Sequence, residues 1–579
     1  MQTVDFTTLV AVFSDIRNHW LPSRLEKVYQ RDRYTITIAL RTLNGRGWLD
    51  ICWHPQAARM CIGDPPPRLP DTFTFSQQLI HQLGGLALIG IEALAPWERA
   101  VDLQFARRPG EAPLYHLYIE IMSKYSNVVL TDAKDTIITV AHQVSEKKSS
   151  VRPLLTGQIY EKPPKLTNTI PTLEESQQRW QERVSLVPGA IKKRLLENYR
   201  GLSPALIESM VYCAGISPQS NTDSLTDDAW EELFQYWQAW LQALTEDKFK
   251  PVSTSTGYNV LGWQALETAN DIQELINKYY INHLNQQQFS QLRHQLSQKL
   301  SNILTKLGVK QQTFANRLQE SQHADTYRQQ ADLLMAYLQN WKPGMTEIEL
   351  PDFETGEPVT IKLEADKNAV QNAQRFYKQH QKLKRASEVV KLLLREVEVE
   401  INYLEQVEAA IAQIDDYKSH IDLQTLEQIR EELIQQKYLE AREYRSPSSK
   451  DAISNFHRYQ TPSGFEVLIG RNNSQNDYLS FRVAGDYDLW FHAQELPGSH
   501  VLLRLEPGTV ADSKDLQFTA NLAAYYSRAR QSEQVPVVYT QPKHVYKPKG
   551  AKPGIAIYKQ ERIIWGQPNT VTQILSKTA

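Results

Sequence analysis

Two long stretches of regularly spaced apolar residues constrain the fold of this chain more than any other feature. The first runs from Ala269 to Lys342 with almost no Gly or Pro, and Gln, Lys, Glu and Leu dominate it. The second, residues 365–442, places apolar side chains at steps of 4, 3, 4, 3, 3, 4 and 3: Val390, Leu394, Val397, Ile401, Leu404, Val407, Ile411 and Ile414. This spacing keeps one helix face apolar. The sequence therefore predicts two long helices, each reaching roughly 100 Å at about 1.5 Å per residue.

The segment between these helices is predicted to reverse the chain. Residues 343–364 begin with Pro343-Gly344 and contain two short alternating runs on either side of a Glu-Thr-Gly-Glu turn, a pattern that favours a β-hairpin. The two helices would then return on each other as an antiparallel coiled-coil arm. An arm of this length extends far beyond a globular core, so we expect it to contact another molecule. An oligomerisation strut is the alternative.

Globular sequence flanks the arm on both sides, and we predict a multidomain α+β fold. Alternating β-type segments characterise both ends of the chain, whereas Ser203 before Pro204 is a predicted helix N-cap within a helix-hairpin-helix pattern. The turn of such a pattern can bind phosphate, and plain structural packing is the alternative. The predicted parts are an α+β domain at residues 1–182, a helix-hairpin-helix region at 183–268, the coiled coil with its middle β insert (about 343–364) at 269–444, and a second α+β domain at 445–579.

Charge and cysteine content exclude several broad classes of protein. The 579 residues include 64 Lys plus Arg against 66 Asp plus Glu, so no global field attracts the chain to nucleic acid or to a membrane. From Arg445 onward the counts are 16 against 11, which concentrates basic charge in the last domain. Three widely spaced cysteines without a CxxC pair argue against a disulfide framework and a structural zinc site. No apolar stretch is long enough to span a bilayer and no secretory signal is recognisable, so we expect a cytoplasmic protein with no membrane partner.

The last domain contains polar clusters that could contact RNA. Strands are predicted at residues 465–470, 478–483, 488–492 and 501–505, followed by a helix at about 515–532. Arg471, Asn472 and Asn473 follow the first strand and are expected on a loop, where they offer hydrogen-bonding groups or simply form a turn. Four lysines in a later segment without acidic residues suit phosphate contacts, with a solvated loop as the alternative: Lys543, Lys547, Lys549 and Lys552.

No recognisable catalytic motif accompanies these clusters. His492 and His500 lie eight residues apart near Asp488 and Trp490, which allows a metal-dependent hydrolase as a hypothesis, but no third ligand follows at a suitable spacing. Patterns for nucleotide binding and for a serine nucleophile are absent from the sequence. We therefore expect no cofactor, no bound metal and no catalytic side chain.

Four motifs in order along the chain stand out: Ile119-Glu-Ile-Met-Ser-Lys-Tyr-Ser-Asn-Val-Val-Leu, Asn372-Ala-Gln-Arg-Phe-Tyr-Lys-Gln-His-Gln-Lys-Leu-Lys, Gly470-Arg-Asn-Asn-Ser-Gln-Asn-Asp, and Asp488-Leu-Trp-Phe-His with Pro497-Gly-Ser-His. Together they resemble the motifs of the NFACT family. The resemblance covers essentially the whole chain, from an NFACT-N domain to an NFACT-R domain.

The resemblance implies a factor of ribosome-associated quality control. Such a protein binds large (50S) ribosomal subunits that carry an obstructed peptidyl-tRNA, and recruits tRNA, in bacteria tRNA-Ala, for template-free extension of the stalled chain. Peptidyl transfer would belong to ribosomal RNA. The NFACT-R residues implied in RNA binding are Arg471, Asn472, Asn473, Asp488, Trp490, His492, His500, Lys543, Lys547, Lys549 and Lys552.

The resemblance also implies a tRNA site in the first domain. The family's Asp-Arg pair and Glu-(Leu/Ile)-Met stretch map onto Glu98, Arg99, Glu120, Ile121 and Met122. Here the pair is Glu-Arg, and Ser123 and Tyr125 replace the family's Gly and His. These departures make tailing activity and the choice of tRNA less certain than subunit binding.

Two other functions remain as alternatives. An adhesin that binds fibronectin is suggested by the names of some family members, although the missing signal peptide and anchor argue against it. A metal-dependent nucleic-acid-processing enzyme that uses His492 and His500 is the third hypothesis. Subcellular fractionation separates the first alternative from a ribosome factor, and metal analysis tests the second.

Overall fold

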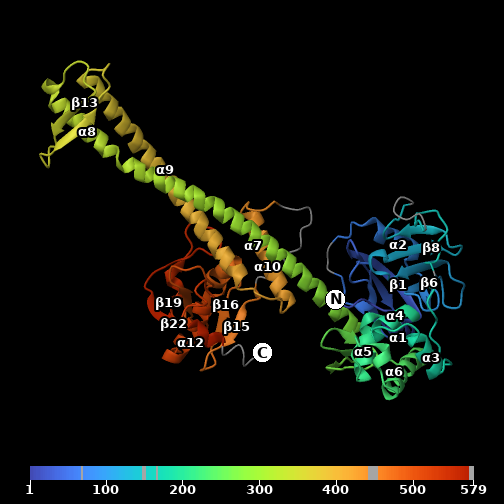
Figure 1. Cartoon of the computed structure of the whole chain (residues 1–579). Helices are drawn as coiled ribbons and strands as arrows, with labels where there is room; N and C mark the ends of the chain where they lie inside the picture. Colours follow the sequence, from blue (N-terminus) through green and yellow to red (C-terminus); the bar gives the residue numbers. More distant parts are fainter. Residues whose placement is uncertain (67–69, 146–151, 165–166, 441–453, 573–579) are drawn as a thin grey trace. The chain divides into compact units, whose positions relative to one another are not determined.

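The computed structural model describes residues 1–66, 70–145, 152–164, 167–440 and 454–572. The chain forms two compact units, Met1–Leu284 and Asn285–Ala579, and each combines helices with β-sheet (Figure 1). The prediction of a multidomain α+β protein is confirmed at this level. The predicted Ser-Pro-Ser-Ser linker at 446–449 lies outside the described residues. No helix among the described residues combines the length and apolar character needed to cross a membrane.

A nine-stranded antiparallel sheet forms the first half of the first unit. Its strand order is β4-β3-β2-β1-β5-β6-β7-β8-β9, so the two halves of the sheet join where β1 pairs with β5. Helices α1 (Phe6–Trp20) and α2 (Thr74–Leu83) accompany it. The strands are β1 Ser23–Asp32, β2 Thr35–Arg41, β3 Arg46–Cys52, β4 Arg59–Gly63, β5 Ala87–Ala93, β6 Ala100–Ala106, β7 Tyr115–Glu120, β8 Asn127–Asp132 and β9 Ile137–Val140.

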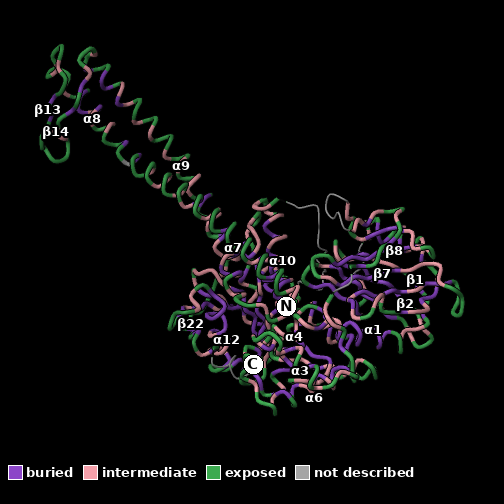
Figure 2. Tube along the Cα trace, turned by 45° about the vertical axis from the view of Figure 1, so that its right-hand side comes forward, coloured by how far each residue is buried: buried purple, intermediate pink, exposed green. Residues whose placement is uncertain are grey.

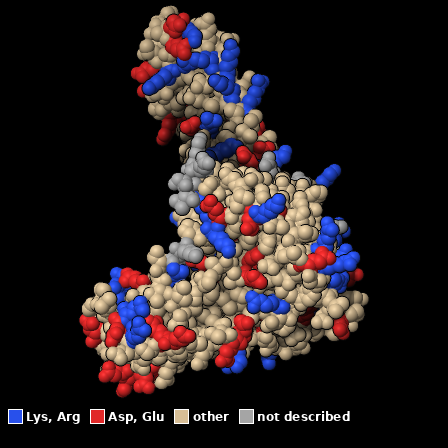
Figure 3. All heavy atoms as spheres, turned by 90° about the vertical axis from the view of Figure 1, so that its right-hand side faces the viewer, with Lys and Arg blue, Asp and Glu red and all other residues tan. Residues whose placement is uncertain are grey.

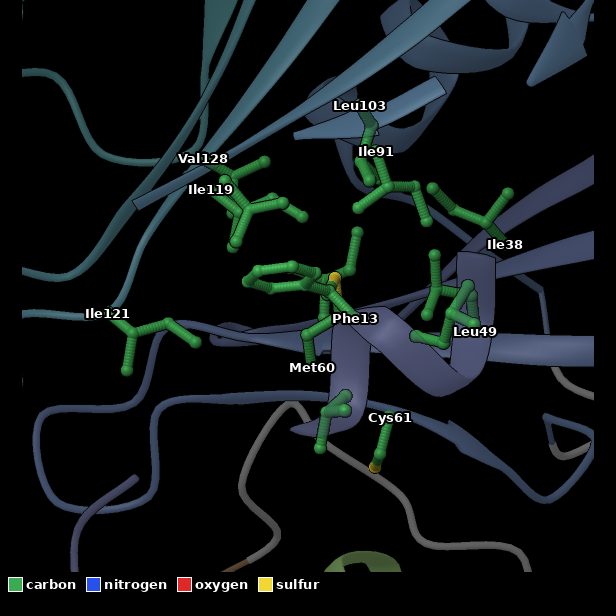
Figure 4. Packing of buried hydrophobic residues seen from close by; sticks show 14 of the residues in the cluster. Phe13, Ile38, Leu49, Met60, Cys61, Ile91, Leu103, Ile119, Ile121 and Val128 are labelled. Atoms are coloured by element: carbon green, nitrogen blue, oxygen red, sulfur yellow. The ribbon is translucent and has the colours of Figure 1, made fainter. Parts of the chain in front are cut away.

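The core of this sheet forms against α1. Asp5 caps α1 by accepting a hydrogen bond from the Thr8 N–H at 2.8 Å, which fixes the first turn. In Figure 4 the ring of Phe13 lies among aliphatic side chains from both halves of the sheet, including Leu49, Ile91 and Ile119. The helix thereby joins the two halves into one hydrophobic core.

Four helices and a small sheet complete the first unit. The helices are α3 Gln177–Ser185, α4 Ile191–Asn198, α5 Pro204–Cys213 and α6 Asp227–Glu246, and the short strands are β10 Val252–Ser253, β11 Tyr258–Asn259 and β12 Glu267–Thr268. Ser203 is the N-cap of α5, with its hydroxyl accepting from the Leu206 N–H at 3.0 Å, which confirms the predicted cap. Trp180, Trp237 and Trp240 are fully buried among these helices.

The long apolar stretches form four helices rather than two. The first stretch gives α7 (Ile272–Gln322) and α8 (Ala324–Ala336), with a turn at His323 between them. The second gives α9 (Ala369–Ala412) and α10 (His420–Gln435). The prediction of one helix over residues 365–442 is wrong because Ser419 and Asp422 form a capping box that begins a new helix.

From Asn285 onward these helices belong to the second unit, where α9 runs antiparallel to α7 and α8. Figure 1 shows α9 beside α7 and α8, and Leu300 and Leu307 of α7 share a buried cluster with Val397 and Leu404 of α9. Strands β13 (Glu347–Pro351) and β14 (Pro358–Lys362) pair between α8 and α9, with Ile348 opposite Ile361. Figure 2 shows that much of α9 is exposed, as expected for helices that bury only one face.

A six-stranded sheet forms the C-terminal part of the second unit. Its order is β15-β16-β18-β17-β19-β22, and α12 (Ser513–Tyr525) covers one face. The strands are β15 His457–Gln460, β16 Glu466–Ile469, β17 Leu489–Ala493, β18 Val501–Leu503, β19 Val535–Thr540 and β22 Arg562–Gly566. The hairpin of β20 (Val545–Tyr546) and β21 (Ile557–Tyr558) contributes to a second cluster on the other face.

Two predictions for this domain are wrong. Residues 472–483 are not a loop followed by a strand: Asn472 caps helix α11 (Asn473–Tyr478), which continues into a π-helical turn at Leu479–Val483. The alternation of apolar residues there resembles a strand, but Leu479 and Val483 both face the second cluster. Helix α12 also ends at Tyr525 rather than near 532, because the following residues bond to the segment 497–499, for example through the Arg528 N–H to the Pro497 carbonyl.

Candidate nucleic-acid interface

The two predicted tRNA motifs of the first domain lie side by side. Arg99 ends the turn between β5 and β6, and its backbone carbonyl accepts a hydrogen bond from the Ile121 N–H at 2.8 Å. The pairing of β6 with β7, which sets Ala100 opposite Glu120, enforces this approach. The Arg99 guanidinium is half-buried and donates through Nη1 to the Val4 carbonyl at 3.3 Å. Glu98 is buried. Residues more than twenty positions apart therefore form one corner of the sheet.

Glu120 is committed to an internal network rather than to solvent. Its side chain is buried, and both carboxylate oxygens accept hydrogen bonds from the guanidinium of Arg152. The Tyr160 hydroxyl donates to Glu120 Oε1 at 2.7 Å, and burial, followed by the Glu120 charge, raises the pKa of Tyr160. Tyr160 therefore stays a donor at neutral pH. Arg152 lies outside every quoted motif, and no sequence signal marked it.

The residues after Met122 form a rigid exposed turn. Ser126 Oγ accepts from the half-buried Met122 N–H at 2.9 Å and donates to the Ser123 carbonyl at 2.8 Å. Ser123 has φ +52°, a left-handed conformation that favours Gly, the residue that the sequence resemblance implies at this position. Tyr125 is 71% exposed, with Lys124 Nζ 5.0 Å from its ring centroid. Ile121, in contrast, is buried in the core. Of the mapped residues and their neighbours, this turn offers the most accessible aromatic and basic groups.

In the last domain, the cluster around Asn472 contacts α10. Asn472 Nδ2 donates to Gln428 Oε1 at 2.7 Å, and Asn473 Nδ2 donates to Glu432 Oε1 at 3.2 Å. Arg471 Nη1 lies 3.5 Å from Asp422 Oδ1. These side chains attach the start of α11 to α10, and RNA contact by any of them stays a prediction.

Trp490, Ser480 and His500 form a buried hydrogen-bond network, Asp488 is bound separately by backbone N–H groups, and the His492 ring contacts the rings of Trp490 and His500. Asp488 accepts from the backbone N–H groups of Gly485 at 2.8 Å and Leu505 at 3.1 Å. Trp490 Nε1 donates to Ser480 Oγ at 2.8 Å, and this hydroxyl bonds His500 Nδ1 at 2.7 Å. The network fixes the π-helical turn against the sheet.

Burial keeps both histidines neutral. It lowers the pKa of His492 to about 4 and that of His500 to about 3, and each stays uncharged at neutral pH. A neutral imidazole cannot supply a positive charge to a phosphate. Across the part of the chain that the structure describes, no group of three or more His, Cys, Asp or Glu side chains could hold a metal ion.

The four predicted RNA-binding lysines have different surroundings: two are exposed without an ion pair, one is paired with a carboxylate, and one is half-buried against aromatic rings. Lys543 and Lys549 are exposed, and neither forms an ion pair with a described residue. Lys547 pairs with Asp477. Lys552 is half-buried, with Nζ 4.6 Å from the ring centroids of both Tyr403 and Tyr438, and it donates to the Tyr438 hydroxyl. Burial lowers the pKa of Lys552. Phosphate contact by these four lysines stays a prediction, and their surroundings differ.

Comparison with known families agrees with this organisation. The family model described as "NFACT N-terminal and middle domains" matches residues 5–452. The chain belongs to the NFACT family. A second model, described as "NFACT protein RNA binding domain", matches residues 455–559 and so covers most of the C-terminal sheet.

Relatives of similar length extend the match over nearly the whole chain. A protein named "Rqc2 homolog RqcH" from Bacillus subtilis is 28% identical over 569 residues, covering 96% of this chain and 96% of that protein. The protein of the same name from Streptococcus pneumoniae is 27% identical over 571 residues, covering 96% and 97%. Among solved structures, the C-terminal part of the fibronectin/fibrinogen-binding protein from Streptococcus suis is 30% identical, covers 48% of this chain and 95% of that one, and has a TM-score of 0.38.

Proposed function

We propose that this NFACT protein acts in ribosome-associated quality control. It binds obstructed large (50S) ribosomal subunits that carry peptidyl-tRNA, and it recruits tRNA, with tRNA-Ala as the expected species, for template-free tailing of the stalled chain. The tail marks the product for degradation. Support comes from the match to the family's RNA-binding domain and from relatives named RqcH along the whole chain.

The observation that carries the proposal is the corner where Arg99 meets the strand end at Glu120–Met122. The backbone bond between Arg99 and Ile121 brings both family motifs to one place, and the turn beside them exposes Lys124 and Tyr125. A guanidinium suits bidentate contact with phosphate or a base edge, and an exposed ring suits stacking on an unpaired base. The buried Glu120–Arg152 pair then supports the corner rather than contacting tRNA itself.

The protein has a binding role in this proposal and no catalytic one. Peptidyl transfer belongs to ribosomal RNA, and the chain has to position tRNA beside the obstructed peptide. The antiparallel helices α7 to α9 act as a coiled-coil arm that contacts the subunit. The α4–α5 pair acts as a helix-hairpin-helix element next to tRNA.

Co-purification of RNA tests the proposal. Affinity purification from cells with obstructed ribosomes, followed by sequencing, is expected to enrich large-subunit rRNA together with one tRNA family. Arg99→Ala and Arg99→Lys are both expected to lose tRNA relative to rRNA, because an ammonium cannot reproduce the planar guanidinium fork. Arg107→Ala, which changes an exposed arginine after β6, is the matched control.

Three outcomes would contradict the proposal. Equal tRNA yield for the wild type and Arg99→Ala removes the role of this corner. Sedimentation at the top of a gradient, with obstructed subunits present at low salt, removes subunit binding. Recovery of the protein mainly from the cell surface, with no rRNA attached, favours the adhesin instead.

A further inference from the structure

The middle of the arm carries a concentration of positive charge that the candidate sites above do not explain. Residues 299–317 of α7 and 378–395 of α9 contain ten Lys plus Arg and one acidic residue, Glu388. We call these two segments the basic shaft. The whole chain is nearly neutral, so this charge is local. Figure 3 shows Lys and Arg side chains together with Asp and Glu side chains on the part of the arm that faces the viewer.

The spacing of these residues places them in rows. In α7 the intervals of seven, four and seven residues keep four cations on one helix face: Lys299, Lys306, Lys310 and Arg317. In α9 one row has intervals of seven and four, Lys384, Lys391 and Arg395, and another has intervals of four and three, Lys378, Lys382 and Arg385. The α7 row extends about 27 Å at about 1.5 Å per residue.

None of the ten cations is neutralised within the described chain. All ten are exposed, and none has a carboxylate oxygen of a described residue within 4.0 Å. Elsewhere on the surface, lysines such as Lys278 pair with a neighbouring glutamate. Like charges four residues apart, as at Lys306 and Lys310, destabilise a helix by a few tenths of a kcal/mol. The basic shaft repeats such pairs, and its one acidic residue, Glu388, has no Lys or Arg nitrogen of a described residue within 4.0 Å, so most of its positive charge is available to a partner.

The tip of the arm has the opposite charge. Residues 345–364, which include β13 and β14, contain six acidic residues and one lysine. The exposed face of this hairpin would repel phosphate. Of these six, Glu364 is paired with Lys367 and Arg375, which follow the hairpin, and the other five form no ion pair with a described residue.

We propose that the basic shaft binds the phosphate backbone of double-helical RNA. This inference rests on the proposed function, since duplex RNA is what a large ribosomal subunit presents on its surface. The only aromatic residue in either segment is Phe314, which is partly buried, so the shaft offers no exposed ring on which an unpaired base could stack. Rows of flexible ammonium groups instead suit contacts to phosphates across a duplex, which are independent of sequence.

A protein partner is the competing occupant of the same surface. Val309, Val389 and Leu392 are exposed at 66%, 57% and 62%, and they could contact an apolar patch. Ten cations against one carboxylate favour RNA, because a protein interface depletes unpaired lysines from its centre.

The test uses the full-length protein and a blunt RNA duplex. In the variant K299Q/K306Q/K310Q/R317Q, the slope of log affinity against log salt is expected to fall by at least 1 and by up to about 3.6, at about 0.9 per lost phosphate contact. The slope is expected to fall in the same way in the α9 variant K384Q/K391Q/R395Q. The control K27Q/K134Q/K248Q/K278Q removes four exposed lysines of the first unit and is expected to leave the slope unchanged. Circular dichroism checks that each variant keeps its helix content.

Each other result overturns the proposal. An unchanged slope in both shaft variants shows that the cations do not contact phosphate. An equal loss in the first-unit control shows a net-charge effect. Unchanged duplex binding combined with lost subunit binding assigns the shaft to a ribosomal protein. Because the duplex assay contains no ribosome, its result is independent of whether the protein acts in quality control.

Discussion

Replacing Lys552 is expected to loosen the attachment of the C-terminal sheet to the arm helices. Lys552 belongs to the segment before β21, whereas Tyr403 lies on α9 and Tyr438 follows α10, so this one ammonium joins three parts of the second unit. Tyr438 in turn donates to Glu400 Oε1 at 3.0 Å, which leaves its oxygen free to accept from Lys552. Lys552→Met keeps the methylene chain and removes the charge and the hydrogen bond.

The magnitude follows from these contacts. Each cation–π contact in a half-buried setting contributes about 1 kcal/mol, and the hydrogen bond to the Tyr438 hydroxyl contributes about 1 kcal/mol more. Lys552→Met should therefore lower the free energy of opening of this region by about 2 to 3 kcal/mol. At 1.4 kcal/mol per tenfold change, opening becomes roughly 30- to 140-fold more frequent.

Native-state hydrogen exchange of the full chain measures this effect directly. Peptides that cover 545–558 and α10 should exchange faster in Lys552→Met, while Lys549→Met, which changes an exposed lysine, should stay within about 0.5 kcal/mol of the wild type. RNA binding should show the reverse order, because only Lys549→Met should lower the salt slope, by about 0.7 to 0.9. Equal hydrogen-exchange rates in the two variants, or a change of the salt slope in Lys552→Met alone, would refute the proposal that Lys552 attaches the C-terminal sheet to the arm helices.

Three further predictions follow from the buried groups and the arm. Glu120→Gln should destabilise the first unit by about 3 to 5 kcal/mol in urea unfolding, because it leaves the Arg152 guanidinium buried without its counter-charge, and exposed Glu111→Gln, as the control, should change stability little. His500 has a folded pKa of about 3, below its unfolded value near 6.5, so its contribution to stability is present above pH 6.5 and is lost as pH falls toward 3. By pH 5 the free energy of unfolding should have fallen by about 2 kcal/mol, and calorimetry of His500→Gln should show a shallower dependence of stability on pH. Deleting residues 311–394 and joining α7 to α9 with a short loop should keep both ends of the chain folded, while binding to large subunits in gradients falls sharply. The larger deletion of 290–425 should also unfold the C-terminal domain, because it removes Tyr403 and most of the hydrophobic cluster that supports α10.

The spacing of apolar residues was sufficient to predict that helices form, but it did not predict where some of them begin and end. The steps from Val390 to Ile411 follow one face of α9, and Ser203 before Pro204 begins α5 as expected. Ser419 and Asp422 were not recognised as a capping box because the apolar spacing continues across the break at Ile414. The run from Tyr478 to Val483 was misread for a similar reason, since a five-residue turn and a strand can both alternate apolar residues over so short a length.

The candidate sites show a different limit. The motifs located Arg99 and Glu120 correctly, but the neutralisation of Glu120 depends on Arg152, 32 positions away in the sequence. Lys552 looked like its neighbour Lys549 in composition, yet it packs against Tyr438, 114 positions away. Contacts of this kind depend on how elements that are distant in the sequence pack together. The periodicity and the residue types of any one segment therefore do not predict them.

The uneven distribution of tryptophan gives the two units different optical signatures. Nine of the twelve Trp residues precede Leu284, and ring centroids such as those of Trp237 and Trp240 are only 5.0 Å apart. Indoles this close exchange excitation energy, so their emission is depolarised and reports mainly on the first unit. The second unit has only Trp341, Trp490 and Trp565, and Trp565 is 56% exposed while Trp490 is buried. Within the second unit a soluble quencher therefore reaches Trp565 directly, whereas the fold shields Trp490 from it.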